Sequence, residues 1–181
     1  RSSVAPDATV NALALLSAVP TPDLPDIATG EIHVESAFGA KPIRVLTYRP
    51  VRSDDPLPVI VHIHGGGFVM GTPEMKDVEN RLFASELKCA IYSVDYRLAP
   101  EHPYPIPLED TLGAIAFALG GELGSDIDAR RWALAGDSAG ATLALAAMIH
   151  RRDAGLTLPA TAALFYGCYA PDFDTRSHAR F

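Results

Sequence analysis

The pentapeptide Gly136-Asp137-Ser138-Ala139-Gly140 is the stretch of this sequence whose residue types and spacing best suit chemistry. It follows a short apolar run and precedes an alanine-rich segment, so a strand, a sharp turn and a helix are expected in that order. Glycines on both sides of the turn avoid side-chain collisions and leave the serine hydroxyl exposed. The pattern predicts Ser138 as a nucleophile; the alternative is an ordinary glycine-bounded turn with a helix-capping serine.

A second glycine-rich motif, His64-Gly65-Gly66-Gly67, follows the apolar run 59–63. Glycines let backbone N–H groups approach a ligand, and an HGGG loop can form the first half of an oxyanion hole. We expect Gly66, Gly67 and Ala139 to donate, each contributing about 3 kcal/mol to transition-state stabilisation. His64 is expected to order the loop rather than to act as a base. A flexible glycine turn is the alternative, and the absence of a following GK[ST] argues against a phosphate loop.

Composition excludes several other classes of function. The 22 acidic residues outnumber the 15 Lys and Arg, for a net charge of −7, which argues against nucleic-acid binding. No apolar run is long enough to predict a transmembrane helix. Cys89 and Cys168 lack the spacing of metal ligands, so no metal site is expected. Two buried thiols in a reducing compartment are expected, with a disulfide as the alternative, and the N-terminus has no signal-peptide pattern. A cytoplasmic protein is therefore expected.

The order of predicted elements indicates an α/β fold. Apolar–polar alternation predicts a hairpin of two strands over 31–38 and 42–48, turning at 39–41. Apolar runs predict further strands at 59–63, 89–94, 131–135 and 161–166, with helices at 72–88, 108–119 and 139–152 between them. An antiparallel start should therefore lead into a mostly parallel sheet with helices on both faces. Both glycine motifs then lie at carboxyl ends of strands, where ligands bind in such sheets.

Three segments together resemble the hormone-sensitive-lipase-like family of α/β-hydrolases: HIHGGGFVMG, SVDYRLAPEHPYPIPLED and ALAGDSAGA. The resemblance implies the α/β-hydrolase fold and cofactor-free hydrolysis of small esters with short or medium acyl chains, through an acyl-enzyme at Ser138. It also implies an N-terminal cap segment over residues 1–28, containing a weakly predicted helix at 8–19, before a core over 29–181. Members of the family are often homodimers.

The sequence departs from the family pattern in two ways. Ala141 replaces a glycine that often follows the serine motif, which is a minor change. More seriously, the triad acid and histidine of this fold follow the serine, and the resemblance places both in regions that these 181 residues do not contain. The chain is therefore expected to lack the last strands and to be inactive alone. Asp172, Asp174 and His178 come in the right order but are too close together to replace them.

Three hypotheses follow from these observations. The first is an esterase whose acid and histidine come from a missing C-terminal part or from a second chain. The second is a receptor-like protein that keeps the pocket and binds a small molecule without turning it over. The third is an inert fragment of the fold. The intact HGGG and GDSAG motifs favour the first, because a receptor does not need both an oxyanion hole and a nucleophile.

Overall fold

The computed structural model describes residues 24–38, 41–120 and 126–170, together with Asp174, Arg176 and Arg180. The helix expected over 8–19 and nearly all of the expected cap segment lie outside these residues. So do Asp172, His178 and most of the predicted hairpin turn at 39–41.

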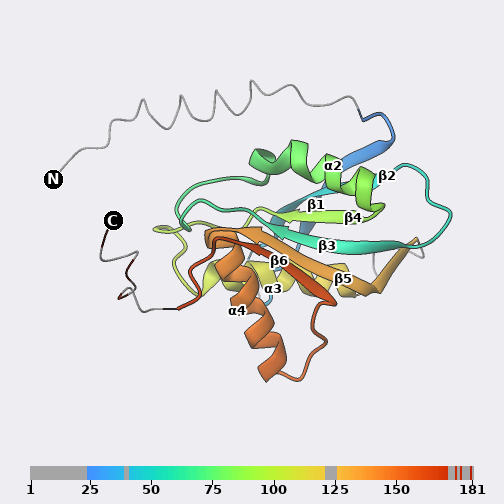
Figure 1. Ribbon diagram of the computed structural model, residues 1–181. Coiled ribbons are helices and arrows are strands. Elements are labelled where there is room, and N and C mark those ends of the chain that lie inside the picture. The colour runs from blue at the N-terminus through green and yellow to red at the C-terminus, as the bar shows by residue number, and fades with distance from the viewer. Residues whose placement is uncertain are drawn as a thin grey trace.

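The centre of the structure is a six-stranded sheet in the order β1-β2-β4-β3-β5-β6. Strands β1 and β2 pair antiparallel, as do β2 and β4, whereas β4, β3, β5 and β6 all run parallel (Figure 1). This is the antiparallel start and parallel continuation expected from the sequence. The strands are β1 (Ile27–Val34), β2 (Ile43–Pro50), β3 (Leu57–Ile63), β4 (Ala90–Val94), β5 (Ile127–Asp137) and β6 (Thr161–Phe165).

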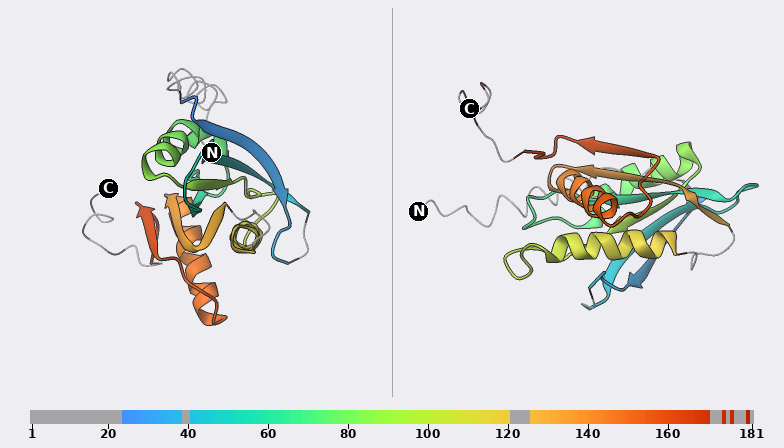
Figure 2. Two further views of the ribbon diagram at one scale, coloured as in Figure 1. Left: turned by 90° about the vertical axis from the view of Figure 1, so that its right-hand side faces the viewer. Right: turned by 90° about the horizontal axis from the view of Figure 1, so that it is seen from below.

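Helices cover both faces of the sheet. Helix α2 (Asp77–Leu87) packs on β1, β2 and β4, whereas α3 (Ile106–Leu119) and α4 (Ala139–Asp153) pack against each other on the opposite face (Figure 2). A short 3₁₀ helix, η1 (Pro73–Lys76), leads into α2. None of the helices among the described residues is long and apolar enough to cross a membrane.

The observed elements differ from the predicted ones at several places. β1 ends at Val34 rather than at residue 38, and the helix predicted over 72–88 divides into η1 and α2. β1 begins at Ile27 rather than at residue 31, because Ile27 through Val34 pair without interruption with Pro50 through Ile43 of β2. β5 runs from Ile127 to Asp137, beyond the predicted 131–135, since its early residues extend the pairing to Leu57 across an irregularity. Thr72 occupies the cap position of η1, yet its side chain makes no capping hydrogen bond.

The middle strands are buried on both faces, as their β-branched runs predict. All five residues of β4 are buried, and Val61 and Ile63 of β3 have no exposed surface. Edge strand β6 instead alternates between exposed and partly buried positions. Apolar burial therefore holds the sheet together at its centre, directly beneath the two glycine motifs.

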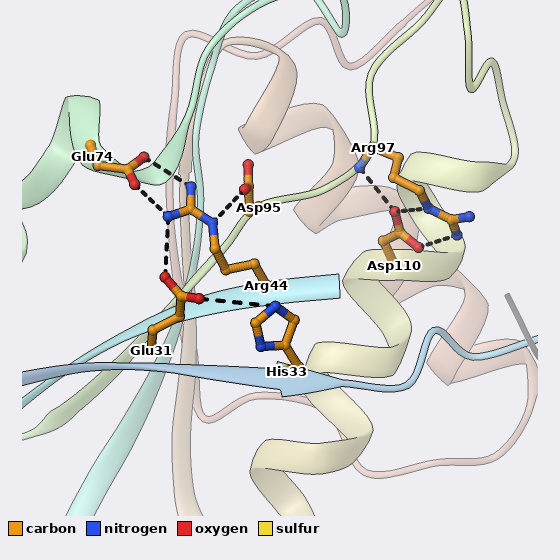
Figure 3. A network of polar contacts seen from close by, with 7 residues as sticks. All are labelled: Glu31, His33, Arg44, Glu74, Asp95, Arg97 and Asp110. Carbon is orange, nitrogen blue, oxygen red and sulfur yellow. Dashed lines mark hydrogen bonds and ion pairs between the residues drawn. The ribbon is translucent and has the colours of Figure 1, made fainter. Parts of the chain in front are cut away.

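A buried ion pair fixes the proline-rich loop after β4. Asp110 of α3 has no exposed surface, and it accepts hydrogen bonds from the Arg97 backbone N–H at 2.9 Å and from the guanidinium Nε at 2.9 Å and Nη2 at 2.5 Å (Figure 3). Hydrogen bonding to Asp110 raises the pKa of Arg97, and Nη2 also donates to Ser36 Oγ at 3.3 Å. Arg97 thus joins three segments: the loop after β4, α3 and the segment after β1.

We predict that Asp110→Asn lowers the free energy of unfolding by about 3 kcal/mol, because the change leaves a partly buried guanidinium without its counter-charge. The control is Asp153→Asn, which removes an exposed pair with Arg152 and should cost less than about 1 kcal/mol. Urea titrations followed by circular dichroism measure both values. Equal losses in the two variants would contradict the structural role of the Arg97–Asp110 pair.

Candidate active site

Ser138 lies at the junction between β5 and α4 in a strained conformation. Its φ of 51° and ψ of −119° place a non-glycine residue in the positive-φ region, which costs free energy and is typical of functional sites. Its N–H donates to the Phe165 carbonyl at 2.9 Å, which ties the turn to the end of β6. Although Ser138 is at the cap position of α4, its side chain makes no capping hydrogen bond. This geometry is the sharp turn that the nucleophile hypothesis requires, not an ordinary serine cap.

The two glycines of the pentapeptide allow backbone segments to approach closely. A Cβ atom at Gly140 would lie 2.0 Å from the Ile63 carbonyl oxygen and 2.5 Å from that of His64. One at Gly136 would lie 2.7 Å from the Gly140 carbonyl carbon. Separations below 3 Å are impossible for real Cβ atoms, so glycine is required at both positions. The close approach brings the start of α4 against the end of β3, where the HGGG loop begins.

The HGGG loop folds back on itself and leaves potential donors free. Gly66 and Gly67 have φ values of 125° and 63°, and a Cβ atom at Gly66 would lie 1.9 Å from the Met70 carbonyl oxygen. The N–H groups of Val69 and Met70 both donate to the Gly66 carbonyl. Among the loop and turn hydrogen bonds of the described residues, none is donated by the N–H of Gly66, Gly67 or Ala139. None of these bonds therefore occupies the three expected donors.

His64 is buried and built into the loop. Its ring stacks on Tyr96 at a centroid distance of 4.3 Å, and the Tyr96 hydroxyl donates to the His64 carbonyl at 3.0 Å. Nδ1 lies 2.7 Å from the Gly65 carbonyl, which only accepts, so Nδ1 carries the proton. Burial lowers the pKa of His64, which keeps the ring neutral. These contacts support the expected ordering role and give His64 no contact with Ser138.

The side chain of Asp137 contacts residues outside the pentapeptide. Its Oδ2 would be only 2.6 Å from a Cβ atom at Gly65, and it accepts a long hydrogen bond of 3.5 Å from the Tyr166 hydroxyl. Its Oδ1 lies 3.8 Å from Lys76 Nζ at the end of η1. Sequence reasoning did not identify Lys76, because nothing in the local pattern indicates a partner 61 positions away.

Arg44 is a second residue that sequence reasoning missed. From β2 it donates through Nε to Asp95 at 2.8 Å and through Nη1 to Glu74 at 2.5 Å, and it lies 3.5 Å from Glu31 (Figure 3). Hydrogen bonding to Arg44 lowers the pKa of Glu74 to about 2. Because Glu74 belongs to η1 and Asp95 follows β4, Arg44 anchors the segment after the HGGG loop to the sheet.

No histidine among the described residues is hydrogen-bonded to Ser138. His62 lies in β3 and shares a 3.1 Å hydrogen bond with Ser93, and His150 of α4 contacts Phe38 edge to face. His33 is exposed on β1, in the antiparallel part of the sheet. The described residues also contain no group of three or more residues with metal-ligating side chains. The hydrogen bonds of the described residues therefore show no histidine paired with Ser138.

A parallel sheet with a strained serine between strand and helix, and a glycine loop beside it, defines an α/β-hydrolase. Residues 60–181 match the family described as "alpha/beta hydrolase fold", and the chain belongs to that family. This confirms the resemblance that the motifs indicated.

Named relatives are esterases. The chain is 38% identical over 135 residues to "Esterase LipI" of Mycobacterium tuberculosis, covering 72% of this chain and 41% of that protein. It is 40% identical over 119 residues to "Carboxylesterase NlhH" of the same species, covering 65% and 37%. The chain thus spans about two fifths of the length of these relatives. The solved structure "Bacterial Heroin Esterase" matches with a TM-score of 0.86 and 31% identity, covering 96% of this chain and 55% of that one.

We predict that Gly140→Ala lowers the free energy of unfolding by about 3 kcal/mol, because the added methyl collides with the β3 backbone. Gly155→Ala is the control: Gly155 has a φ of 67° but nothing within 4 Å, so only backbone strain of about 1 kcal/mol opposes the change. Thermal and urea unfolding compare the two. A Gly140→Ala variant as stable as Gly155→Ala would show that the contact between α4 and β3 is not tight.

A pH effect on stability is expected from His62. Burial, with a smaller effect of Lys76, lowers the pKa of His62 to about 3, whereas an unfolded histidine titrates near 6.5. Between these values the unfolded chain binds the extra proton, so stability falls as the pH falls. Protonation of His62 in the unfolded chain should lower the free energy of unfolding by about 1.5 kcal/mol between pH 6.5 and 5.

Measuring the free energy of unfolding across this range in wild type and His62→Gln tests the effect. The variant should show a shallower slope than the wild type. Identical slopes in wild type and His62→Gln would contradict the assignment.

Proposed function

We propose that this chain carries the nucleophile and the oxyanion hole of a serine carboxylesterase that acts on esters with short or medium acyl chains. The observation that carries the proposal is Ser138, held at a φ of 51° where β5, α4 and the start of the HGGG loop meet. The esterase names of the relatives support hydrolysis of carboxylic esters as the reaction.

In the proposed mechanism, Ser138 Oγ attacks the ester carbonyl carbon while a base removes its proton. The carbonyl oxygen gains negative charge, which the N–H groups of Gly66, Gly67 and Ala139 stabilise, aided by the positive N-terminal end of α4. The C–O bond then breaks, the alcohol leaves with a proton, and an acyl-enzyme remains on Ser138. Water attacks this ester in the same way and releases the carboxylic acid.

The base and its acid partner are proposed to be a histidine and a carboxylate outside the described residues, in a following part of the protein or in a second chain. Without them, Ser138 keeps its proton and is a poor nucleophile. We also propose a cytoplasmic location, since both cysteines are free thiols: Cys89 is buried as expected, whereas the expected burial of Cys168 is wrong, because it is exposed. No observation favours a receptor or an inert fragment, and both remain as outcomes of the experiment below.

We predict that Ser138→Ala, made in the longest protein that contains this sequence, lowers kcat for p-nitrophenyl butyrate by about 10⁴-fold or more. A fluorophosphonate probe should label the parent protein and not the variant. The control Ser53→Ala changes an exposed serine in the loop between β2 and β3 and should leave both readouts unchanged.

The outcomes separate the hypotheses. Hydrolysis and labelling that survive Ser138→Ala would contradict the proposed nucleophile. If the longest protein that contains this sequence shows neither hydrolysis nor labelling, but binds a small molecule saturably, the protein is receptor-like. The 181-residue chain alone should hydrolyse the ester no faster than its Ser138→Ala variant; a Ser138-dependent rate there would place the base within these residues.

A further inference from the structure

The carboxylate of Asp137 contacts both ends of the segment 65–76, which begins with the HGGG glycines and ends with η1. At the first end, Oδ2 packs against Gly65 so closely that no side chain fits there. At the other end, Oδ1 faces the Lys76 ammonium at 3.8 Å. One side chain, next to Ser138 in sequence, thus joins the beginning and the end of the segment that carries the donors Gly66 and Gly67.

The Asp137 carboxylate places a negative charge at the edge of the sheet that carries the proposed oxyanion hole, and Lys76 neutralises this charge. The Asp137 side chain is only 16% exposed, and Oδ1 is buried without any hydrogen bond. At Tyr96, burial raises the pKa and the negative charge of Asp137 raises it further. At His64 that charge also raises the pKa, but the larger effect of burial lowers it. An unneutralised charge here would oppose the negative charge that develops on the substrate oxygen, because both lie at the same edge of the sheet.

The Lys76 side chain is mostly shielded from solvent. Its side chain is 26% exposed, and its charge lowers the pKa of His62, which is 7% exposed, in addition to the larger effect of burial. A second carboxylate, that of Glu79, lies 3.6 Å from the ammonium. Among the described residues, Lys76 is the only cation within 4 Å of Asp137.

We propose that Asp137 and Lys76 form a clasp that positions the HGGG loop against Ser138 and cancels the carboxylate charge beside the oxyanion hole. Both act as positioning residues, since their effect on the substrate passes through the backbone of residues 65–71 and through the local field. The inference rests on the proposed function for its catalytic consequence, whereas the clasp itself is a property of the loop.

The experiment compares Lys76→Met, Asp137→Asn and the double variant. The control is Lys41→Met, which removes an exposed lysine just before β2. Steady-state hydrolysis of p-nitrophenyl butyrate is measured in the longest protein that contains this sequence. Hydrogen–deuterium exchange is measured on the same variants, with peptides covering 65–71 and, as an internal reference, β4. Ser138→Ala is included as the test of the proposed function.

Lys76→Met should lower kcat about tenfold while KM changes less than about twofold, because an effect on loop geometry and charge is felt in the transition state. Adding Lys76→Met to Asp137→Asn should have little further effect, since the two groups act as one unit. Exchange in 65–71 should rise severalfold in both single variants, with β4 unchanged. Lys41→Met should match the parent protein in every readout.

Two results would overturn the clasp: Lys76→Met that behaves like Lys41→Met, or losses of the two single variants that multiply in the double variant. Exchange that rises equally in 65–71 and β4 would also overturn it, because the pair would then serve general stability only. Activity that persists in Ser138→Ala, or is absent throughout, would instead contradict the proposed function. In that case the exchange in 65–71 still decides whether the clasp exists.

Discussion

The contact between Gly140 and the end of β3 is the constraint on which the rest of the site depends. Because no Cβ atom fits between α4 and the Ile63 carbonyl oxygen, the helix can start directly over the parallel sheet. This start forces the chain through a sharp turn, which Ser138 accomplishes at positive φ. The same contact brings the first turn of α4 beside the HGGG loop, so one close approach sets both the exposed serine and the N–H groups around it.

Ion pairs, together with the packing of Phe68, Tyr96 and Leu98 on the core, hold the loops at this edge of the sheet. Arg44 connects Glu74 and Asp95, Arg97 binds Asp110, and Lys76 faces Asp137. In each pair the acidic and basic partners come from different elements of the fold, as Figure 3 shows for the first two. The glycines that present backbone N–H groups have no side chains to bury, although Phe68 of the same loop packs against the core. Charged side chains from neighbouring elements therefore fix its position.

This arrangement suits a preorganised site. Oxyanion stabilisation is effective when the donors are already in place and do not need to move during the reaction. The neutral His64 ring, stacked on Tyr96 and bonded to Gly65, adds rigidity without adding a charge. The described residues thus contain the proposed nucleophile on its turn and the proposed donors, and the proton-transferring groups are proposed to lie beyond them. Such a division agrees with a chain that spans about two fifths of its curated relatives.

The sequence by itself determined the local and periodic features. Apolar runs specified the buried strands, and the glycine motifs specified the two turns, because φ preferences and burial patterns are encoded by neighbouring residues. It predicted the order of strands and helices, the antiparallel start, and the positions of Ser138, Gly66, Gly67 and Ala139 on turns. The pairing of β1 and the length of β5 were predicted less well, since the partner strand decides where pairing begins.

Only the tertiary structure decided which charges meet. Arg44 pairs with residues 30 and 51 positions away, and no local pattern distinguishes it from a surface arginine. Lys76 and Asp137 meet because two parallel strands end side by side and α2 begins above them. Long-range ion pairs depend on how the strands are ordered in the sheet, and a charged side chain carries no periodicity that reveals its partner. The sequence specified the turns and the donors, and the fold decided what holds them in place.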